Sequence, residues 1–416
     1  MIFKVILLFL FVVLSESAYE GERCVKDGVG GVCTNLKRCQ SAIADLRSRK
    51  NPQICSFDGA EPIVCCLDSK TAANPTSPSF GATTPPQKRP PVITTTDDDD
   101  DEEEGECEAL DASMTPSKTG QKAFDKCIEY QEQLVYPCEA GASLLGDLAR
   151  SNYCHHNADE LIIGGNNSAQ YEFPHMVMLG YGKSINELQW QCGGTLISER
   201  FILTAGHCIK VDRGGPHYAL VGALARSETA DRSKLYKIKN IIKHPKYDSP
   251  NKYHDIALVE TEKQIKLDQF TVPACIHTGD EVDDTQILAT GWGLTQYNTL
   301  ASVADILQKV ILSKFSTAEC SRKYTPNRLM SQGFDAKTQM CYGDRGAVPV
   351  ESKNQHKDTC QGDSGGPIQI KSTKIYCMYT VVGVTSFGRA CGFGDPGIYT
   401  RVANYVPWIE SVVWPN

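Results

Sequence analysis

The chain has 416 residues, of which 41% are hydrophobic and 18 are cysteines. This length exceeds what one hydrophobic core usually organises, so we expect several domains. The formal net charge is −8, and the eight consecutive acidic residues at 97–104 account for all of it. The rest of the chain is balanced, which removes any electrostatic reason to expect a nucleic-acid partner.

The N-terminus predicts export from the cell. Met1 to Lys4 gives a short basic start, and residues 5–14 follow without a polar side chain. That apolar run is too short to span a bilayer and is typical of a signal peptide, expected here over residues 1–18. We see no later membrane span, and the many cysteines suit an oxidising compartment, so we expect a secreted, extracellular protein.

Residues 22–67 form a first candidate domain, which is small and rich in cysteine. It contains Cys24, Cys33, Cys39, Cys55, Cys65 and Cys66. Six cysteines allow fifteen pairings, and their spacing alone cannot choose among them. A zinc site is the competing interpretation, although no histidine lies nearby. With so little core, the domain would depend on disulfides of about 2–4 kcal/mol each.

Residues 68–106 have the composition of a disordered linker. Thr, Pro, Ser and Ala dominate, and the acidic run follows. Such a segment cannot bury enough apolar surface to fold. The acidic run could bind calcium or a basic partner, but runs of this kind are usually just solvated.

A third segment, residues 107–161, contains Cys107, Cys127, Cys138 and Cys154. Residues 123–134 have a moderately helical pattern. The segment ends in the sequence Leu-Ile-Ile-Gly-Gly, which begins at Leu161.

Three later motifs contain the groups needed for nucleophilic catalysis. They are Thr-Ala-Gly-His-Cys at 204–208, His-Asp-Ile-Ala-Leu at 254–258 and Gly-Asp-Ser-Gly-Gly at 362–366. Ser364 would be the nucleophile, His207 its general base and Asp255 the carboxylate that orients the imidazole. The backbone N–H groups of Gly362 and Ser364 would form the oxyanion hole.

On these motifs, the region from Ile162 to the C-terminus resembles the chymotrypsin-like serine proteases. The resemblance implies an all-β fold of two packed antiparallel β-barrels with the active site between them. Pattern alone supports this modestly, with short strands expected at 196–197, 201–203 and 381–384 and a terminal helix at 405–413. We therefore expect a protease domain over residues 162–416.

The adjacent pair Cys65-Cys66 makes residues 22–67 resemble the arthropod clip domain. The pairing of that family implies the disulfides Cys24–Cys65, Cys33–Cys55 and Cys39–Cys66. A clip domain would serve to dock partners or cofactors.

The resemblance also predicts specificity for Arg or Lys. Asp358 precedes the nucleophile by six residues, which is the position at the base of the substrate pocket in this family. Gly388 and Gly397 match the pocket-wall glycines that leave room for a long side chain. A buried carboxylate needs a cationic partner.

The junction before Ile162 resembles the activation site of the family. Cleavage after Leu161 would free the α-amino group of Ile162, which would pair with Asp363 and order the site, so the chain is expected to be a zymogen. Leucine does not suit a pocket built on Asp358, so self-activation should be negligible. An upstream protease with apolar specificity is implied, as in clip subfamily C.

Further disulfides follow from the family pattern: Cys192–Cys208, Cys320–Cys341 and Cys360–Cys391. Cys275 matches the position that tethers the light chain, and Cys154 is the preferred partner, with Cys138 second. Cys107, Cys127, Cys377 and the unused light-chain cysteine remain unassigned.

We expect no cofactor and no metal. The loop after Val221-Gly222 lacks the carboxylate that starts the trypsin calcium loop, although Glu228 and Asp231 leave a calcium site open. Asn166 begins the only glycosylation sequon of the chain.

The predicted function is a secreted serine endopeptidase zymogen in an immune (Toll or melanisation) or developmental cascade. Its partners would be the upstream activator, a downstream protease zymogen and a serpin-type inhibitor. The alternative is a catalytically silent homologue that acts as a scaffold, against which the intact triad argues. The clip domain and the long tether speak against a digestive protease.

Overall fold

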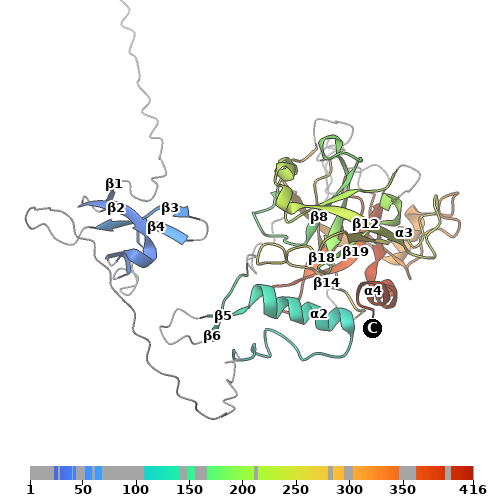
Figure 1. Ribbon diagram of the computed structural model, residues 1–416. Coiled ribbons are helices and arrows are strands. Elements are labelled where there is room, and N and C mark those ends of the chain that lie inside the picture. Colours follow the sequence, from blue (N-terminus) through green and yellow to red (C-terminus); the bar gives the residue numbers. More distant parts are fainter. Residues whose placement is uncertain are drawn as a thin grey trace, which may run out of the picture. The chain divides into compact units, whose positions relative to one another are not determined.

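The computed structural model of the chain divides into two compact units, residues 1–99 and 100–416 (Figure 1). The residues that it describes are 23–26, 29–39, 41–43, 52–58, 61–67, 107–140, 148–154, 166–209, 214–279, 284–294, 303–345, 362–388 and 395–415. In this part of the chain, none of the helices has the length and apolar character needed to cross a membrane.

The first unit contains an antiparallel sheet of four strands with little hydrophobic core. Its order is β1 (Arg23–Lys26), β2 (Val29–Asn35), β4 (Glu61–Leu67) and β3 (Ile54–Asp58), and the turn η1 (Leu36–Arg38) follows β2. The buried cluster is formed by Cys39, Ala42 and Val64. A core this small leaves the sheet dependent on covalent cross-links.

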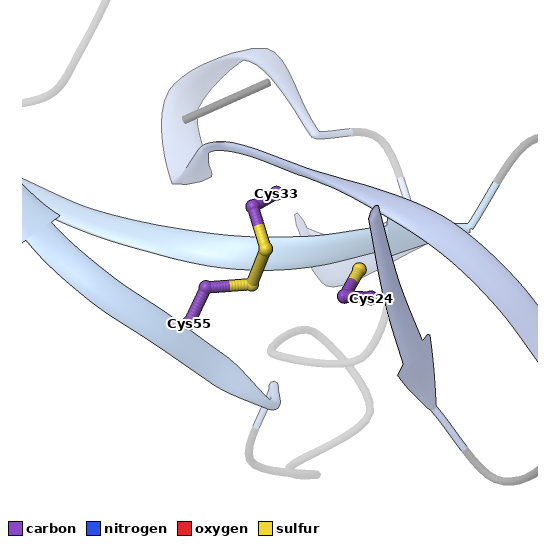
Figure 2. A group of neighbouring side chains, drawn as sticks. All are labelled: Cys24, Cys33 and Cys55. Atoms are coloured by element: carbon purple, nitrogen blue, oxygen red, sulfur yellow. A yellow bond between two sulfur atoms is a disulfide. The ribbon is translucent and has the colours of Figure 1, made fainter. Parts of the chain in front are cut away.

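Three disulfides supply those cross-links: Cys24–Cys65, Cys33–Cys55 and Cys39–Cys66. The pairing implied by the clip resemblance is confirmed. Adjacent residues of a strand point to opposite faces, so Cys65 and Cys66 can reach different partners. Figure 2 shows the Cys33–Cys55 bond beside the sulfur of Cys24. These sulfurs form disulfides, so the alternative zinc interpretation is wrong.

Six strands of the second unit close into a first barrel in the order β10-β13-β12-β11-β8-β9. Their bounds are β8 (Met176–Tyr181), β9 (Gln189–Leu196), β10 (Phe201–Thr204), β11 (Tyr218–Val221), β12 (Leu235–Lys243) and β13 (Ala257–Thr261). Short helical turns lie between them: η3 (Ile185–Glu187), η4 (Gly206–Ile209), η6 (Arg226–Ala230) and η7 (Arg232–Lys234). The predicted strand at 201–203 is confirmed, whereas Ile197 lies beyond the end of β9.

A second antiparallel barrel is closed by the pairing of β19 with β20. It consists of β15 (Gln286–Gly291), β16 (Gln308–Lys314), β17 (Gln339–Gly343), β18 (Pro367–Lys371), β19 (Tyr379–Phe387) and β20 (Gly397–Arg401). Two short strands also pair with strands of this barrel, β7 (Asn166–Asn167) with β16 and β14 (Cys275–Ile276) with β19. The helical elements are α3 (Thr317–Lys323), η10 (Val402–Tyr405) and α4 (Val406–Val413). The expected all-β, chymotrypsin-like double barrel and its terminal helix are confirmed.

Residues 107–154 belong to the same unit as the two barrels. The segment contains α2 (Lys122–Tyr130), η2 (Gln131–Val135), β5 (Cys138–Ala140) and β6 (Leu148–Arg150). The helix α2 lies beside β14 and the C-terminal helix α4 (Figure 1). Its buried face, with Cys127 and Ile128, packs on Val272, Ile375 and Met378 of the protease region. We call residues 107–154 the light-chain segment.

Polar contacts at both ends of α2 strengthen this packing. The Glu410 carboxylate of α4 accepts from the backbone N–H of Ala123 at 2.9 Å, and the Lys122 ammonium donates to the Trp414 carbonyl at 2.9 Å. Each helix thus satisfies a terminal backbone group of the other. At the far end, the Tyr130 hydroxyl donates to Glu199 at 3.0 Å.

The disulfides of the light-chain segment correct one prediction. Cys275 pairs with Cys127, and Cys154 pairs with Cys377, so the expected Cys154–Cys275 bond is wrong. The second choice, Cys138, pairs with Cys107. The reason is that Cys127 lies on the buried face of α2. This helix packs on β14, and Cys275 is the first residue of β14.

The other disulfides of the protease region follow the family pattern where they can be seen. Cys192–Cys208 and Cys320–Cys341 are confirmed. The predicted Cys360–Cys391 bond lies outside the described residues.

Candidate active site

Strand pairing in the first barrel brings His207 and Asp255 to the same place. β10 and β13 are antiparallel, with Thr204 opposite Ala257. His207 follows Thr204 by three residues, in the turn η4, and Asp255 precedes Ala257 by two. Residues that follow one strand and precede its antiparallel partner lie at the same barrel end.

The two side chains make a direct, two-point contact. His207 Nδ1 lies 2.8 Å from Asp255 Oδ2, and the His207 backbone N–H donates to Oδ1 at 2.7 Å. Asp255 is fully buried, and the His207 side chain is 18% exposed. The imidazole is therefore fixed in orientation while one edge stays accessible.

Two residues that the sequence did not indicate complete the environment of Asp255. The Ser386 hydroxyl donates to Oδ2, and the Thr400 hydroxyl donates to the Asp255 carbonyl at 2.8 Å. Ser386 lies two residues before Gly388, the predicted pocket-wall glycine, and this proximity is the one signal that could have pointed to it.

These contacts keep the carboxylate ionised. Burial acts to raise the pKa of Asp255, but the charge of His207 and the hydrogen bonds from His207 and Ser386 outweigh it, and the pKa lies below its usual value. An ionised Asp255 favours the tautomer with its proton on Nδ1, which leaves Nε2 to accept a proton.

The turn that contains Ser364 packs against the same end of the first barrel. The Ser364 carbonyl accepts from the Gly193 N–H at 2.8 Å, and Gly365 donates to the Thr385 carbonyl at 2.8 Å. A Cβ on Gly365 would meet the Thr204 hydroxyl and would lie 3.1 Å from the Cys208 sulfur. Gly365 also has a φ of +79°, so only glycine suits this position. The turn thereby places Ser364 beside the segment that contains His207.

The predicted oxyanion donors, Gly362 and Ser364, flank Asp363 in this turn. Gly362 has a φ of +104°, and the N–H of Gly366 closes the turn on the Asp363 carbonyl at 2.9 Å. The structure gives this backbone arrangement, and the role of the two N–H groups remains a prediction.

The Asp363 carboxylate lies against the turn at 291–293 of the second barrel. Its Oδ1 accepts from the Gly293 N–H at 2.8 Å. A Cβ on Gly291 or Gly293 would collide with this carboxylate, so both glycines are required by its position. Leu161 and Ile162 lie outside the described residues, and the predicted pairing of Ile162 with Asp363 stays a prediction.

Two glycines face each other at the predicted specificity pocket. Gly388 follows β19 and Gly397 begins β20, and a Cβ on Gly388 would lie 3.8 Å from the Gly397 Cα. Side chains here would fill the space between the two segments. Asp358, the predicted base of the pocket, lies outside the described residues.

The loop considered for calcium uses its carboxylates internally. Glu228 Oε1 accepts from the backbone N–H groups of Leu224 and Ala225 at 2.7 and 2.8 Å, and its other oxygen binds the Lys234 ammonium. Burial acts to raise the pKa of Glu228, but these hydrogen bonds lower it overall. Asp231 accepts from the Ser233 N–H at 2.9 Å. A lysine thus supplies the positive charge in this loop.

Within the described ranges, the two clusters of residue types that could bind a metal both include disulfide cysteines. They are Cys24, Cys33 and Cys55 (Figure 2), and Cys192, His207 and Cys208. Sulfur in a disulfide is not a thiolate ligand.

Asn166, the predicted glycosylation site, is exposed in β7 opposite Lys309 of β16. Its exposure is compatible with a glycan, and the modification stays a prediction.

Comparison with known proteins agrees with this site. Residues 162–409 match the profile of the family described as Trypsin. The chain is 36% identical to serine protease snk of Drosophila melanogaster over 61% of this chain and 57% of that protein. It is 32% identical to CLIP domain-containing serine protease B4 of Anopheles gambiae, over 72% of this chain and 84% of that protein.

A third relative is phenoloxidase-activating factor 1 of Holotrichia diomphalia, with 32% identity over 61% of this chain and 70% of that protein. The match to serine protease snk covers little more than half of that relative's length.

Proposed function

Since the chain belongs to the trypsin family of serine proteases, and within it to the arthropod clip-domain proteases, we propose that it is a secreted endopeptidase zymogen. The observation that carries the proposal is the buried Asp255 bound to His207, with the Ser364 turn packed on the same barrel end. A buried, ionised carboxylate hydrogen-bonded to a partly exposed histidine is the arrangement expected of a general base.

In the proposed reaction, Ser364 Oγ attacks the scissile carbonyl while His207 Nε2 takes its proton. His207 later delivers that proton to the leaving amine, and water repeats the sequence on the acyl-enzyme. Asp255 holds the ring and stabilises the imidazolium. The N–H groups of Gly362 and Ser364 would stabilise the oxyanion, and losing one such donor costs about 3–4 kcal/mol in a comparable enzyme.

We propose Arg or Lys as the residue before the scissile bond. The facing glycines, Gly388 and Gly397, support a pocket with room for a long side chain. Asp358 would neutralise the substrate cation. Replacement of Asp358 by Ser should shift preference toward apolar residues, and unchanged arginine selectivity would refute this assignment of the pocket.

Activation is proposed to follow cleavage after Leu161 by an upstream protease with apolar specificity. The pocket proposed here suits Arg and Lys, so the enzyme should not cleave its own junction. Leucine above a buried, unpaired carboxylate is penalised by several kcal/mol. This separation of specificities corresponds to clip subfamily C. Purified zymogen that cleaved itself after Leu161 would refute it.

We further propose that the active enzyme cleaves a downstream clip-protease zymogen in an extracellular immune or developmental cascade. One relative, phenoloxidase-activating factor 1, is named for the activation of phenoloxidase. A serpin-type inhibitor would end the activity. Mixing the active enzyme with candidate zymogens and sequencing the new N-termini would identify the substrate.

The proposal is tested on the full chain with Leu161→Arg, cleaved by immobilised trypsin and assayed on an arginyl amide. Sequencing should show the new N-terminus at Ile162. Turnover is expected, and a matched chain that also has Ser364→Ala should be inactive, which controls for residual trypsin. Correctly cleaved protein that binds partners but does not turn over substrate would instead favour a silent scaffold.

A further inference from the structure

The surface loop formed by residues 222–228 is hydrogen-bonded to the turn at 291–293, which contacts the Asp363 carboxylate. Within this loop, Arg226 begins η6 and its side chain is half-buried. Its Nη1 donates to the Trp292 carbonyl and its Nη2 to the Trp190 carbonyl, each at 3.3 Å. Trp190 belongs to β9 of the first barrel, and Trp292 directly follows β15 of the second. Arg226 therefore bridges the two barrels through backbone atoms.

Trp292 is held a second time by the same loop. Its indole N–H donates to the Leu224 carbonyl at 2.9 Å, and the residue is 2% exposed. Residues 222–228 therefore hydrogen-bond Trp292 twice, once at its backbone carbonyl and once at its indole N–H. The position of this tryptophan is set from outside its own barrel.

The loop itself is anchored on a third segment. The Arg226 N–H donates to the Asp305 carbonyl at 2.9 Å, and the Ser227 N–H and hydroxyl bind the Asp305 carboxylate at 3.0 and 3.1 Å. Together with the Glu228–Lys234 contact, these bonds make the loop a fixed platform for the Arg226 side chain.

The turn that Arg226 holds is in contact with the predicted oxyanion donors. Trp292 lies between Gly291 and Gly293, and the Gly293 N–H binds Asp363 at 2.8 Å. A Cβ on Gly362 would lie 2.8 Å from the Gly293 Cα, so the two backbones are in close contact. A displacement of the turn would displace Gly362 and Ser364 with it.

We infer that Arg226 is a positioning residue for the oxyanion hole, acting through the Trp292 carbonyl and the turn at 291–293. The inference rests on the proposed peptidase function. It adds Arg226, which is far from Ser364 in the sequence, to the residues that affect the reaction. We expect its effect on the chemical step, because the oxyanion develops only as the tetrahedral intermediate forms, and not on the pocket that binds the substrate cation.

The experiment compares Arg226→Met with the parent chain carrying Leu161→Arg, both activated as above. Methionine keeps an unbranched apolar stem and loses both hydrogen bonds. We expect kcat per titrated active site to fall by about 10- to 100-fold, which is the effect of misplacing catalytic groups by about 1 Å. KM should change by less than about two-fold, because ground-state binding in the pocket is retained. Arg226→Lys, which can keep one of the two bonds, should lie between.

Two inhibitors separate the oxyanion hole from the pocket. Benzamidine occupies only the cation pocket, so its inhibition constant should be unchanged in Arg226→Met. Ser364 Oγ attacks the carbonyl carbon of a peptidyl arginine aldehyde. The C=O π bond opens to place an oxyanion in the hole, and the hydroxyl proton passes to His207 Nε2. The inhibition constant of the aldehyde should rise by the same factor as kcat/KM falls.

Matched controls keep the test decisive. Arg232→Met removes an exposed arginine of the neighbouring turn η7 and should match the parent. If Arg226→Met folds poorly, Trp292→Phe removes the indole N–H, keeps most of the ring packing and should lower kcat in the same way. If the parent is active and kcat is unchanged in Arg226→Met and Trp292→Phe, or if both inhibitors are weakened equally, the inference about Arg226 is wrong while the proposed function stands. An inactive parent would overturn the proposed function together with the inference.

Discussion

Residues 23–67, which we call the clip sheet, and the light-chain segment are both short, disulfide-bonded regions that precede the protease barrels. They use their cysteines in opposite ways. All three disulfides of the clip sheet close within residues 24–66. Two of the three disulfides that involve the light-chain segment leave it, for Cys275 and Cys377. The first region carries its own framework, whereas the second is built as part of the protease body.

The largest expected effect concerns these two outward bonds. After cleavage at the activation site of the Leu161→Arg chain, a variant lacking only the Cys127–Cys275 pair or only the Cys154–Cys377 pair should stay a single species on a non-reducing denaturing gel. Only the variant with all four residues changed to serine should release the light chain. Release from either two-cysteine variant would show that the remaining bond does not form.

Core substitutions should separate the two regions energetically. Ile128→Ala removes a side chain that is 2% exposed and packs on the protease region, so it should destabilise the protease unit by about 2–5 kcal/mol. Val64→Ala, at a fully buried position of the clip sheet, should leave the protease unit unchanged. Amide hydrogen exchange followed by mass spectrometry would report each region separately. If the Val64→Ala variant lost protection from amide exchange in the protease barrels, the two units would not be energetically independent.

Acid should also act on the two regions differently. Burial, with the neighbouring charges of His254 and Lys246, lowers the pKa of His244 to about 4. The ring packs against His254, Tyr405 and Trp408. Between pH 6.5 and 4 the unfolded chain binds the proton and the folded chain does not, so stability falls as pH falls, by at most about 1.4 kcal/mol per pH unit.

Residues 23–67 contain no histidine and should lack this contribution. Thermal unfolding of the protease unit at pH 7 and pH 5 measures the slope, and His244→Asn should reduce it. A slope that is the same in His244→Asn would assign the acid sensitivity to other groups.

The smallest expected effect is at the contact between α2 and α4. Glu410→Ala removes the carboxylate that accepts from the Ala123 N–H and should lower stability by about 1 kcal/mol. Glu187→Ala, at an exposed position of η3, is the matched control. Equal unfolding temperatures for the two variants would show that the contact contributes nothing measurable.

The same contrast explains what could be predicted from the sequence. The clip pairing was implied correctly because all six cysteines belong to one compact family pattern. Cys154 was chosen as the partner of Cys275 because it lies nearest to the cleavage junction, but disulfides follow distance in space. The sequence indicated the helical pattern of residues 123–134, but only the structure shows that Cys127 lies on the buried face of this helix and pairs with Cys275.

At the candidate site, chain order and flanking residues indicated His207 and Asp255, which the structure brings into contact. Ser386 and Arg226 were missed because neither lies in a motif. Ser386 acts through a hydrogen bond from β19 to Asp255, and Arg226 acts through backbone carbonyls of both barrels. Contacts of this kind join segments far apart in the chain and have no local pattern.

The two outward bonds of the light-chain segment have a consequence for how far the products of cleavage can diffuse. A cut after Leu161 would add two chain ends to the protein without dividing its mass, because both fragments stay covalently joined. Whatever holds the N-terminal unit in place would hold the newly active catalyst there as well, and its output would be confined to that neighbourhood.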